Sequence, residues 1–244
     1  MLDTFNMIKT LKALVKKLPI AFTKNQQYDA QTVKILQKIC RPNSNCIDIG
    51  CHKGEMLDLI LKFSPRGQHF CFEPLPDLFQ GLVQKNYPKN CQFFDLALSR
   101  EKGETTFNYV ISNPSYSGIL RRRYDRADEE DTTITVKTDL LDNVIPSNTH
   151  IDFIKIDVEG AEMLVLEGAK RTIERCKPIV VFEHGLGASD VYGTTPRQIF
   201  LFFEQCGLHI SLMRDWLTGK PVLSQEAFEA QFYSGKNYYF IAHV

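Results

Sequence analysis

Near residue 50, two glycines and an acid follow a short apolar segment in a pattern that suits a small, charged ligand. A strand at 46–50 followed by a helix would present free backbone N–H groups at the start of that helix, and glycines at the turn let a ligand approach the backbone. This region supplies five candidate cofactor-binding residues: Asp48, Gly50, Cys51, His52 and Gly54. A sixth candidate, Glu73, ends the next apolar segment, where a carboxylate can accept hydrogen bonds from both hydroxyls of a ribose.

The spacing of the glycines distinguishes between two kinds of cofactor. A dinucleotide pyrophosphate requires Gly-x-Gly-x-x-Gly, but the third position of this loop is His52. Gly50 and Gly54 are instead spaced Gly-x-x-x-Gly, with Asp48 two residues earlier, which suits a ligand carrying one carboxylate and one ammonium. We therefore expect S-adenosyl-L-methionine as the cofactor, with a dinucleotide site and an ordinary strand–turn–helix corner as the alternatives.

The end of the third predicted strand, 91–98, is the expected position of an adenine ring. Asp95 offers a carboxylate there, while Leu96 and Ala97 offer backbone groups. We include Asp95 and Ala97 among the cofactor-binding candidates. The alternative is that Asp95 is a plain turn residue.

A second group of ionisable residues lies in and after the apolar segment 151–157. Side chains alternate along a strand, so Lys155, Asp157 and Glu159 point broadly the same way. A lysine in a buried parallel strand is costly unless it is paired. If the first and fourth strands are neighbours, Asp48 and Lys155 lie at a similar height. We predict that these two residues pair beneath the methionine part of the cofactor, and that Asp157 also contacts the cofactor.

Three residues at the carboxyl edge of the predicted sheet are candidates for catalysis: His184, Asp157 and Glu159. A hydroxyl that accepts a methyl group must lose its proton, and a positioned base typically contributes about 10²–10⁴-fold. His184 is the first candidate because an ordinary histidine pKa is close to neutral, and Asp157 is the second. As alternatives, His184 is a hydrogen-bonded loop residue and Glu159 favours a helix start. Our main prediction includes no metal, although the carboxylates with His184 could also hold Mg²⁺.

The run IDFIKIDVEGAE at 151–162, followed by LEGA at 166–169, resembles the signature of the FkbM-type S-adenosylmethionine-dependent methyltransferases. The ALS segment at 97–99 with Gly103 resembles the same family. The resemblance extends over about 44–185 and, more loosely, the terminal strands. It implies a seven-stranded class I fold, S-adenosylmethionine as methyl donor and O-methylation, often of sugar or polyketide hydroxyls. The segment 113–132 departs from the family pattern and is expected to help select the acceptor.

Two features argue against nucleic acid as the acceptor. The NPSY tetrapeptide at 113–116 resembles the NPPY loop of amino-group DNA methyltransferases, which must follow a parallel strand. Here the preceding strand, 105–111, comes too soon after Leu98 for a parallel crossover. The chain has 29 Lys+Arg and 29 Asp+Glu, without the basic excess typical of nucleic-acid binding.

We therefore expect a sugar or another small-molecule hydroxyl as the acceptor. The insertion contributes aromatic residues that suit sugar rings and arginines that suit anionic substituents: Tyr116, Arg121, Arg122, Arg123 and Tyr124. The alternative is that the arginines pair with acids at 128–131 on a solvated surface. A nicotinamide-dependent oxidoreductase and a non-catalytic S-adenosylmethionine-binding protein are the competing functions.

The segments that must position these residues alternate between strand and helix patterns. Strands are expected at 46–50, 68–74, 91–98, 151–157, 178–184, 209–215 and 237–244, with helices at 54–64, 76–87, 161–176 and 195–207. This alternation is typical of βαβ units. The predicted fold is α/β and doubly wound, with a mostly parallel seven-stranded sheet and an antiparallel last strand. Residues 1–43 form a helical extension, and 44–244 a Rossmann-like domain with a small β insertion at about 99–150.

Three further features of the sequence indicate where in the cell the protein is expected to be. A predicted helix at 3–18 has an apolar face with lysines mostly opposite, which suits packing on the domain or contact with a membrane surface. No apolar run reaches the length of a membrane span. The seven cysteines are scattered, so we expect reduced thiols and a cytoplasmic location. The sequence does not predict the oligomeric state.

Overall fold

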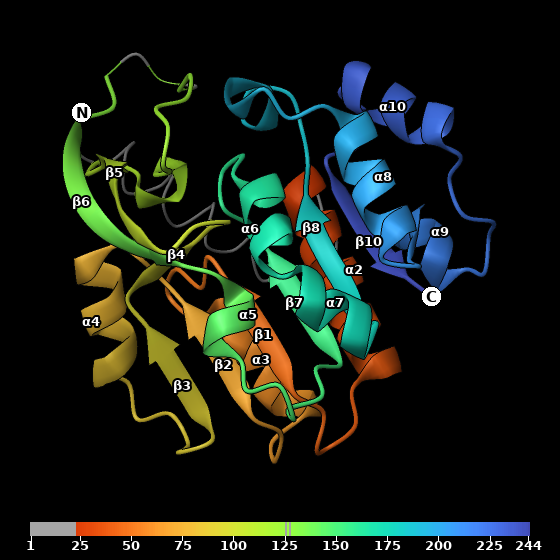
Figure 1. The fold of residues 1–244 in the computed structure, drawn as a ribbon, viewed down its shortest axis with the longest axis horizontal. Coiled ribbons are helices and arrows are strands. Elements are labelled where there is room, and N and C mark those ends of the chain that lie inside the picture. The colour runs from red at the N-terminus through yellow and green to blue at the C-terminus, as the bar shows by residue number, and fades with distance from the viewer. Residues whose placement is uncertain (1–22, 125, 127) are drawn as a thin grey trace, which may run out of the picture.

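Seven strands form one sheet, in the order β3-β2-β1-β7-β8-β10-β9, in a computed structural model that describes residues 23–124, 126 and 128–244 (Figure 1). The strands are β1 (Cys46–Ile49), β2 (His69–Phe72), β3 (Cys91–Phe94), β7 (Phe153–Ile156), β8 (Ile179–Glu183), β9 (His209–Leu212) and β10 (Tyr239–His243). β10 runs antiparallel to β8 and β9, while β3, β2, β1, β7 and β8 pair in parallel. The predicted fold class is confirmed. The helix predicted at 3–18 lies outside the described residues.

The strand order reverses between β1 and β7. β2 and β3 extend from one side of β1, whereas β7 and β8 extend from the other. The register places Asp48 of β1 beside Cys71 of β2 and beside Lys155 of β7. The loops that follow β1 and β7 therefore diverge at the carboxyl edge of the sheet, where ligands bind in open α/β folds.

Side-chain alternation along the strands divides the core into two layers. On one face, Ile154 and Phe182 pack in a cluster with residues of α6 (Glu162–Gly168), α7 (Lys170–Cys176), α8 (Pro196–Gln205), α10 (Gln225–Tyr233) and the short α5 (Leu141–Val144). On the other, Phe153 and Val181 pack with residues of α2 (Lys24–Ile39), α3 (Glu55–Phe63) and α9 (Met213–Leu217). α4 (Pro76–Gln84) joins α3 over β2. The charged residues of the central strands alternate with apolar residues such as Ile154 and Phe182. Their side chains therefore lie on the face of the sheet that α2 covers.

A second sheet of three strands lies at one end of the first, beside β2 and β3 (Figure 1). It contains β4 (Leu96–Leu98), β6 (Asp131–Asp139) and β5 (Gly103–Val110), with β4 parallel and β5 antiparallel to the central β6. The single strand predicted at 91–98 is therefore wrong, because the chain changes sheet at Asp95. The strand 131–139 was not predicted. β5 belongs to this second sheet and does not pair in parallel with β4, in agreement with the prediction that 105–111 comes too soon after Leu98 for a parallel crossover.

Two other predicted boundaries differ from the structure. The helix predicted at 161–176 is divided into α6 and α7 at Ala169, next to the point where Gly168 packs closely on the backbone of Ser99. The strand predicted at 209–215 ends at Leu212, and α9 begins at Met213, whose buried side chain packs with α2. Helix α10 was not predicted, and two of its aromatic residues pack against His184.

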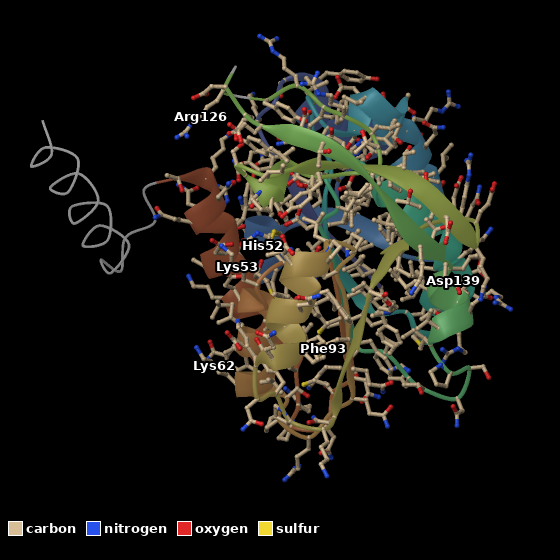
Figure 2. The ribbon with its side chains drawn as sticks, turned by 90° about the vertical axis from the view of Figure 1, so that its left-hand side faces the viewer. His52, Lys53, Lys62, Phe93, Arg126 and Asp139 are labelled. Carbon is tan, nitrogen blue, oxygen red and sulfur yellow. The ribbon has the colours of Figure 1, made fainter. Side chains whose placement is uncertain are left out.

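The turn between β1 and α3 lies at the surface of the molecule. Figure 2 shows His52 and Lys53 together at the turn before α3, and Lys62 near the end of the same helix. All seven cysteines lie in the described part of the chain and are free thiols. Within that part, no helix is long and apolar enough to span a membrane.

Candidate active site

A cavity of about 810 Å³ opens at the carboxyl ends of the central strands. Its walls come from the β1–α3 loop, the small sheet, the segment after β5, helix α2 and the residues around the start of β10. Seven of the residues predicted from the sequence line it: Gly50, Cys51, His52, Glu73, Ala97, Asp157 and Glu159. Four are not among the lining residues: Asp48, Gly54, Asp95 and His184.

The two loop glycines are required by the packing of the chain on itself. Gly50 has φ +78°, and a Cβ there would lie 1.9 Å from the backbone oxygen of Asp157. Gly54 has φ +84° and directly precedes α3, where a Cβ would lie 2.4 Å from the hydroxyl oxygen of Tyr87. Larger residues would force the loop away from β7 or from Tyr87. The glycines therefore shape the loop, although only Gly50 reaches the cavity.

Glu73 follows β2 directly, and the β1–α3 loop holds its carboxylate in place. Its two oxygens accept hydrogen bonds from the backbone N–H of His52, at 2.8 Å, and of Leu75, at 3.0 Å. The residue is 5% exposed, and burial raises its pKa to about 7 against the lowering effect of these two bonds. Because each oxygen keeps a free lone pair, the carboxylate can still accept hydrogen bonds from a ligand.

The predicted adenine-binding residues separate at the change of sheet. Ala97 and its neighbour Leu96 line the cavity from β4. Asp95 forms an ion pair with Lys137, at 3.0 Å, and about half of its side chain is exposed. The structure therefore argues against Asp95 as a cofactor-binding residue and agrees with the alternative of a turn acid paired on the surface.

Asp48 lies under the loop rather than in the cavity. It is 1% exposed, and neither carboxylate oxygen accepts a hydrogen bond from an N–H or O–H of the described residues. It is the register neighbour of Lys155, as predicted, but the Lys155 ammonium binds Asp157 instead. The predicted Asp48–Lys155 ion pair is therefore wrong. Burial raises the pKa of Asp48, and the charge of Lys155 and the Cys51 thiol oppose this effect only in part.

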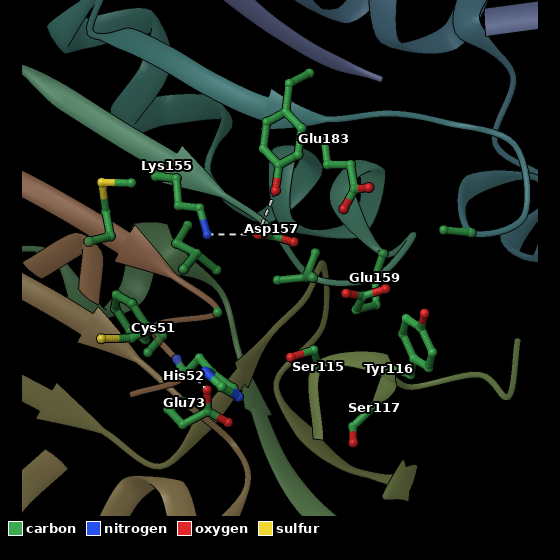
Figure 3. Close-up of a pocket in the computed structure, with 18 of the residues that line it drawn as sticks. Cys51, His52, Glu73, Ser115, Tyr116, Ser117, Lys155, Asp157, Glu159 and Glu183 are labelled. Carbon is green, nitrogen blue, oxygen red and sulfur yellow. Dashed lines mark hydrogen bonds and ion pairs between the residues drawn. The ribbon is translucent and has the colours of Figure 1, made fainter. Parts of the chain in front are cut away.

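Asp157 lies at the centre of a hydrogen-bonded group on the cavity wall (Figure 3). Its Oδ2 accepts hydrogen bonds from Lys155 Nζ, at 2.8 Å, and from the hydroxyl of Tyr239, at 2.6 Å. Burial opposes ionisation, but the charge of Lys155 and these hydrogen bonds lower the pKa of Asp157. β7 and β10 both pair with β8, so these groups converge next to Glu183 at the end of β8.

Three carboxylates approach one another at this point. One oxygen each of Asp157, Glu159 and Glu183 lies within 4.8 Å of the other two. Burial and the negative charge of Asp157 raise the pKa of Glu159 to about 8 and that of Glu183 well above its ordinary value. Such a cluster also has the ligand type that divalent cations prefer. Here Lys155 and Arg122 already supply positive charges to two of the three carboxylates, so we assign no metal to it.

The insertion brings Arg122 to the cavity. Its Nη1 lies 2.7 Å from Glu159 Oε2, and its guanidinium carbon lies 4.5 Å from the centre of the Tyr116 ring. Arg122 is 16% exposed at its side chain and lines the cavity together with Tyr116. Its neighbour Arg121 is largely exposed and pairs with Asp131. The predicted surface pairing therefore holds for Arg121 but not for Arg122.

His184 does not lie in the cavity. It is fully buried, and its ring stacks on Phe228 and Phe232 of α10, with ring centres 5.8 and 4.6 Å away. Neither ring nitrogen has a hydrogen-bond partner among the described residues, and burial lowers its pKa to about 4. An uncharged ring enclosed by aromatic side chains cannot reach a substrate. This geometry argues against the prediction of His184 as the base.

Several lining residues were not assigned a role from the sequence. Glu183 directly precedes His184, and strand alternation points it to the side of Asp157. Tyr239 gave no signal, because its partner is 82 residues earlier in the chain. Helix α2 contributes Asp29 and Tyr28, and the Tyr28 hydroxyl donates to Asn237, at 3.1 Å. Helix α2 and the residues around the start of β10 thus form one wall.

The sequence is similar to those of known methyltransferases. The family model of the methyltransferase FkbM domain matches residues 48–210, which include the loop, Glu73 and the carboxylate cluster. The chain is 29% identical over 168 residues to the 2-O-methyltransferase NoeI of Sinorhizobium fredii (strain NBRC 101917 / NGR234), covering 64% of this chain and 68% of that protein.

Two further similarities cover smaller parts of the other protein. The chain is 26% identical over 162 residues to the AMB antimetabolite synthetase AmbE of Pseudomonas aeruginosa, covering 52% of this chain and 8% of that protein. The crystal structure of methyltransferase FkbM from Methylobacillus flagellatus KT aligns with 16% sequence identity and a TM-score of 0.42, covering 74% of this chain and 49% of that one.

Proposed function

The chain belongs to the FkbM methyltransferase family, and we propose that it transfers a methyl group from S-adenosylmethionine to a hydroxyl oxygen of a sugar or another small molecule. One observation carries the proposal. The cavity has the loop-bound carboxylate of Glu73 on one wall and the carboxylates of Asp157, Glu159 and Glu183 on another (Figure 3). The Glu73 carboxylate can accept hydrogen bonds from the hydroxyls of a ribose. The other three carboxylates can lie near a positively charged sulfur and accept the proton of a hydroxyl.

The residues present fit the cofactor. Glu73 has free lone pairs for the ribose hydroxyls, and Ala97 offers an apolar surface and backbone groups for the adenine. Asp48, under the loop, is a buried acid without an N–H or O–H donor among the described residues, so the positive charge of a ligand ammonium bound at the loop would favour its ionised form. When bound, S-adenosylmethionine supplies an electrophilic methyl group on a positively charged sulfur.

The protein must orient the acceptor and remove its proton. The rate of methyl transfer between two bound molecules depends strongly on their alignment, and a cavity that encloses both can hold them in that alignment. Asp157 remains our candidate for the carboxylate that contacts cofactor and acceptor, because Lys155 and Tyr239 fix its position. Glu159, which Arg122 holds, lies beside it. The cluster that these two residues form with Glu183 replaces His184 as the source of the base.

The charges of the cavity favour an uncharged acceptor. Six acids line it: Asp29, Glu55, Glu73, Asp157, Glu159 and Glu183. The lysine and arginine residues among the described lining residues are Lys155 and Arg122, and each already contacts one of these carboxylates. A phosphate or carboxylate on the acceptor would lie among these acids without an unpaired lysine or arginine of the described residues to compensate its charge. Hydroxyls of a neutral sugar can instead donate hydrogen bonds to these acids. The relative named as a 2-O-methyltransferase supports oxygen as the accepting atom.

Calorimetric titration and product analysis test this proposal. The full chain should bind S-adenosylmethionine with a Kd in the micromolar range, about −8 kcal/mol, and should not bind NADH. Incubation with a panel of neutral glycosides should yield S-adenosylhomocysteine and a methylated product whose mass spectrum places the methyl group on oxygen. Tight NADH binding without any response to S-adenosylmethionine would contradict the proposal. Methylation of nitrogen only would contradict its choice of acceptor atom.

A further inference from the structure

Among the described residues, the carboxylate cluster has one acid more than it has positively charged partners. Lys155 Nζ lies 2.8 Å from Asp157, and Arg122 Nη1 lies 2.7 Å from Glu159. Glu183 has no ion pair with a described residue, although its carboxylate lies within 4.8 Å of the other two. Like charges this close in a partly buried site cannot all ionise at ordinary cost, so one of them retains a proton.

The described residues around Glu183 supply no further positive charge to compensate this excess of acids. Acids face it from the segment between β7 and α6, at Asp157 and Glu159, and from the first residue of α6, at Glu162. Tyrosines face it from α2 and β10, at Tyr28, Tyr238 and Tyr239. The cations are Lys155 and Arg122, which contact the neighbouring acids. Glu183 is therefore the member of the cluster that no described cation contacts, and we assign the proton to it. Burial with these neighbours raises its pKa, whereas the charge of Arg122 opposes the rise in the pKa of Glu159.

The missing positive charge matches a property of the cofactor. S-adenosylmethionine carries a charge on its sulfur, whereas S-adenosylhomocysteine, the product after methyl transfer, has a neutral sulfur at the same place. We propose that Glu183 is protonated in the free protein, that binding of the sulfonium releases this proton, and that the resulting Glu183 carboxylate receives the proton of the acceptor hydroxyl. This inference rests on the proposed function and deepens it.

The reaction balances with no other participant. The hydroxyl oxygen forms a bond to the methyl carbon as the carbon–sulfur bond breaks, and the sulfur keeps the electron pair of the broken bond. The hydroxyl proton passes to Glu183, so the cluster returns to its protonated form when the product sulfur becomes neutral. The proton that the overall reaction produces thus enters the solvent when the cofactor binds, not during methyl transfer.

Calorimetry with both ligands tests this directly, without knowledge of the acceptor. The heat of binding is measured at pH 7 in buffers that differ in their enthalpy of ionisation, and the dependence on buffer gives the number of protons released. S-adenosylmethionine should release about one proton more than S-adenosylhomocysteine. From pH 6.5 to 7.5 its affinity should rise about 10-fold relative to that of the product. Both ligands share the same amino-acid end, so the difference isolates the sulfur. Equal proton release by the two ligands in the wild-type protein would overturn the proposal.

Matched variants identify the group that carries the proton. Glu183→Gln should remove the difference between the two ligands and change their relative pH dependence to less than twofold. Glu159→Gln should keep the difference, because Arg122 holds that carboxylate. Loss of the difference in Glu159→Gln with retention in Glu183→Gln would overturn the assignment to Glu183. The exposed Glu204→Gln on α8 controls for the loss of one acid elsewhere.

The experiment also separates this inference from the function on which it rests. If the wild-type protein binds neither ligand, the proposed function fails. If it binds both with equal proton release, only the inference about Glu183 fails. If Glu183→Gln does not fold, the comparison of the two ligands on the wild-type protein still decides whether the sulfonium displaces a proton.

Discussion

Lys155 lies beside Asp48 in the register of β7 on β1, yet its ammonium binds Asp157, two residues further along its own strand. The reason is the hydrogen bond from Tyr239, which holds the Asp157 carboxylate over the end of β7. Asp48 is left buried without a hydrogen bond from an N–H or O–H of the described residues. This arrangement leaves one carboxylate fixed on the cavity wall and another buried under the β1–α3 loop without an ion pair among the described residues.

Replacing Asp157 should separate chemistry from folding. Asp157→Asn preserves the shape of the side chain but removes the charge that Lys155 neutralises. We expect the rate of methyl transfer to fall at least about 100-fold, the size of a typical loss of acid–base and positioning groups. Release of S-adenosylhomocysteine under saturating cofactor measures this rate. Circular dichroism of the variant provides the folding control, and an unchanged rate in a folded variant would remove Asp157 from the mechanism.

Replacing Glu73 should weaken cofactor binding. Glu73→Ala removes the carboxylate that the backbone N–H groups of His52 and Leu75 orient. Loss of a charge-assisted hydrogen bond costs roughly 1.5–3 kcal/mol, or about a 10- to 150-fold rise in Kd. Calorimetric titration with S-adenosylmethionine measures it. Asp95→Asn is the matched control, because Asp95 pairs with Lys137 outside the cavity and should leave the Kd unchanged. The reverse result would restore Asp95 to the binding site.

His184 should affect stability at acid pH rather than catalysis. Its folded pKa is lowered to about 4, so between that value and its unfolded pKa of about 6.5 the unfolded chain binds more protons. The free energy of unfolding therefore falls as the pH decreases through this window, by roughly 3 kcal/mol over its full width. His184→Phe, which keeps an aromatic ring against Phe228 and Phe232, should remove this contribution and retain methyl transfer. Thermal unfolding at pH 5 and pH 7 measures the first effect. A 100-fold loss of turnover with normal cofactor binding would reinstate His184 as the base.

Shortening the insertion should affect the acceptor more than the cofactor. Val110 and Asp131 are directly paired across β5 and β6, so deletion of 114–130 leaves a short loop between adjacent strand ends. The deletion removes Tyr116 and Arg122 from the cavity wall but leaves Glu73 and the loop residues in place. We expect S-adenosylmethionine affinity within a few-fold of wild type and loss of methyl transfer to the acceptor. Normal transfer by this variant would show that the insertion is only a surface loop. Arg121→Gln, which alters an exposed pair, should leave transfer unchanged.

The sequence by itself determined the fold class, most strand and helix positions and one wall of the cavity. These depend on local patterns: the spacing of apolar residues, the turn glycines and the acid at the end of β2. The same patterns predicted that Asp48 and Lys155 lie side by side, because strand alternation determines the face and height of each side chain. The position of Glu73 beside the loop follows from the same reasoning, since β1 and β2 are parallel neighbours.

Only the tertiary structure decided which charged groups meet. Lys155 binds Asp157 rather than Asp48 because Tyr239 arrives from the last strand, and no local pattern links Tyr239 to β7. His184 is enclosed because α10, whose apolar periodicity is weak, places Phe228 and Phe232 against its ring. Arg122 reaches Glu159 only because β6 returns antiparallel to β5 and positions the insertion over the cavity. Periodicity encodes which face of an element is buried, whereas the partner of a buried ion depends on elements that fold together from distant parts of the chain.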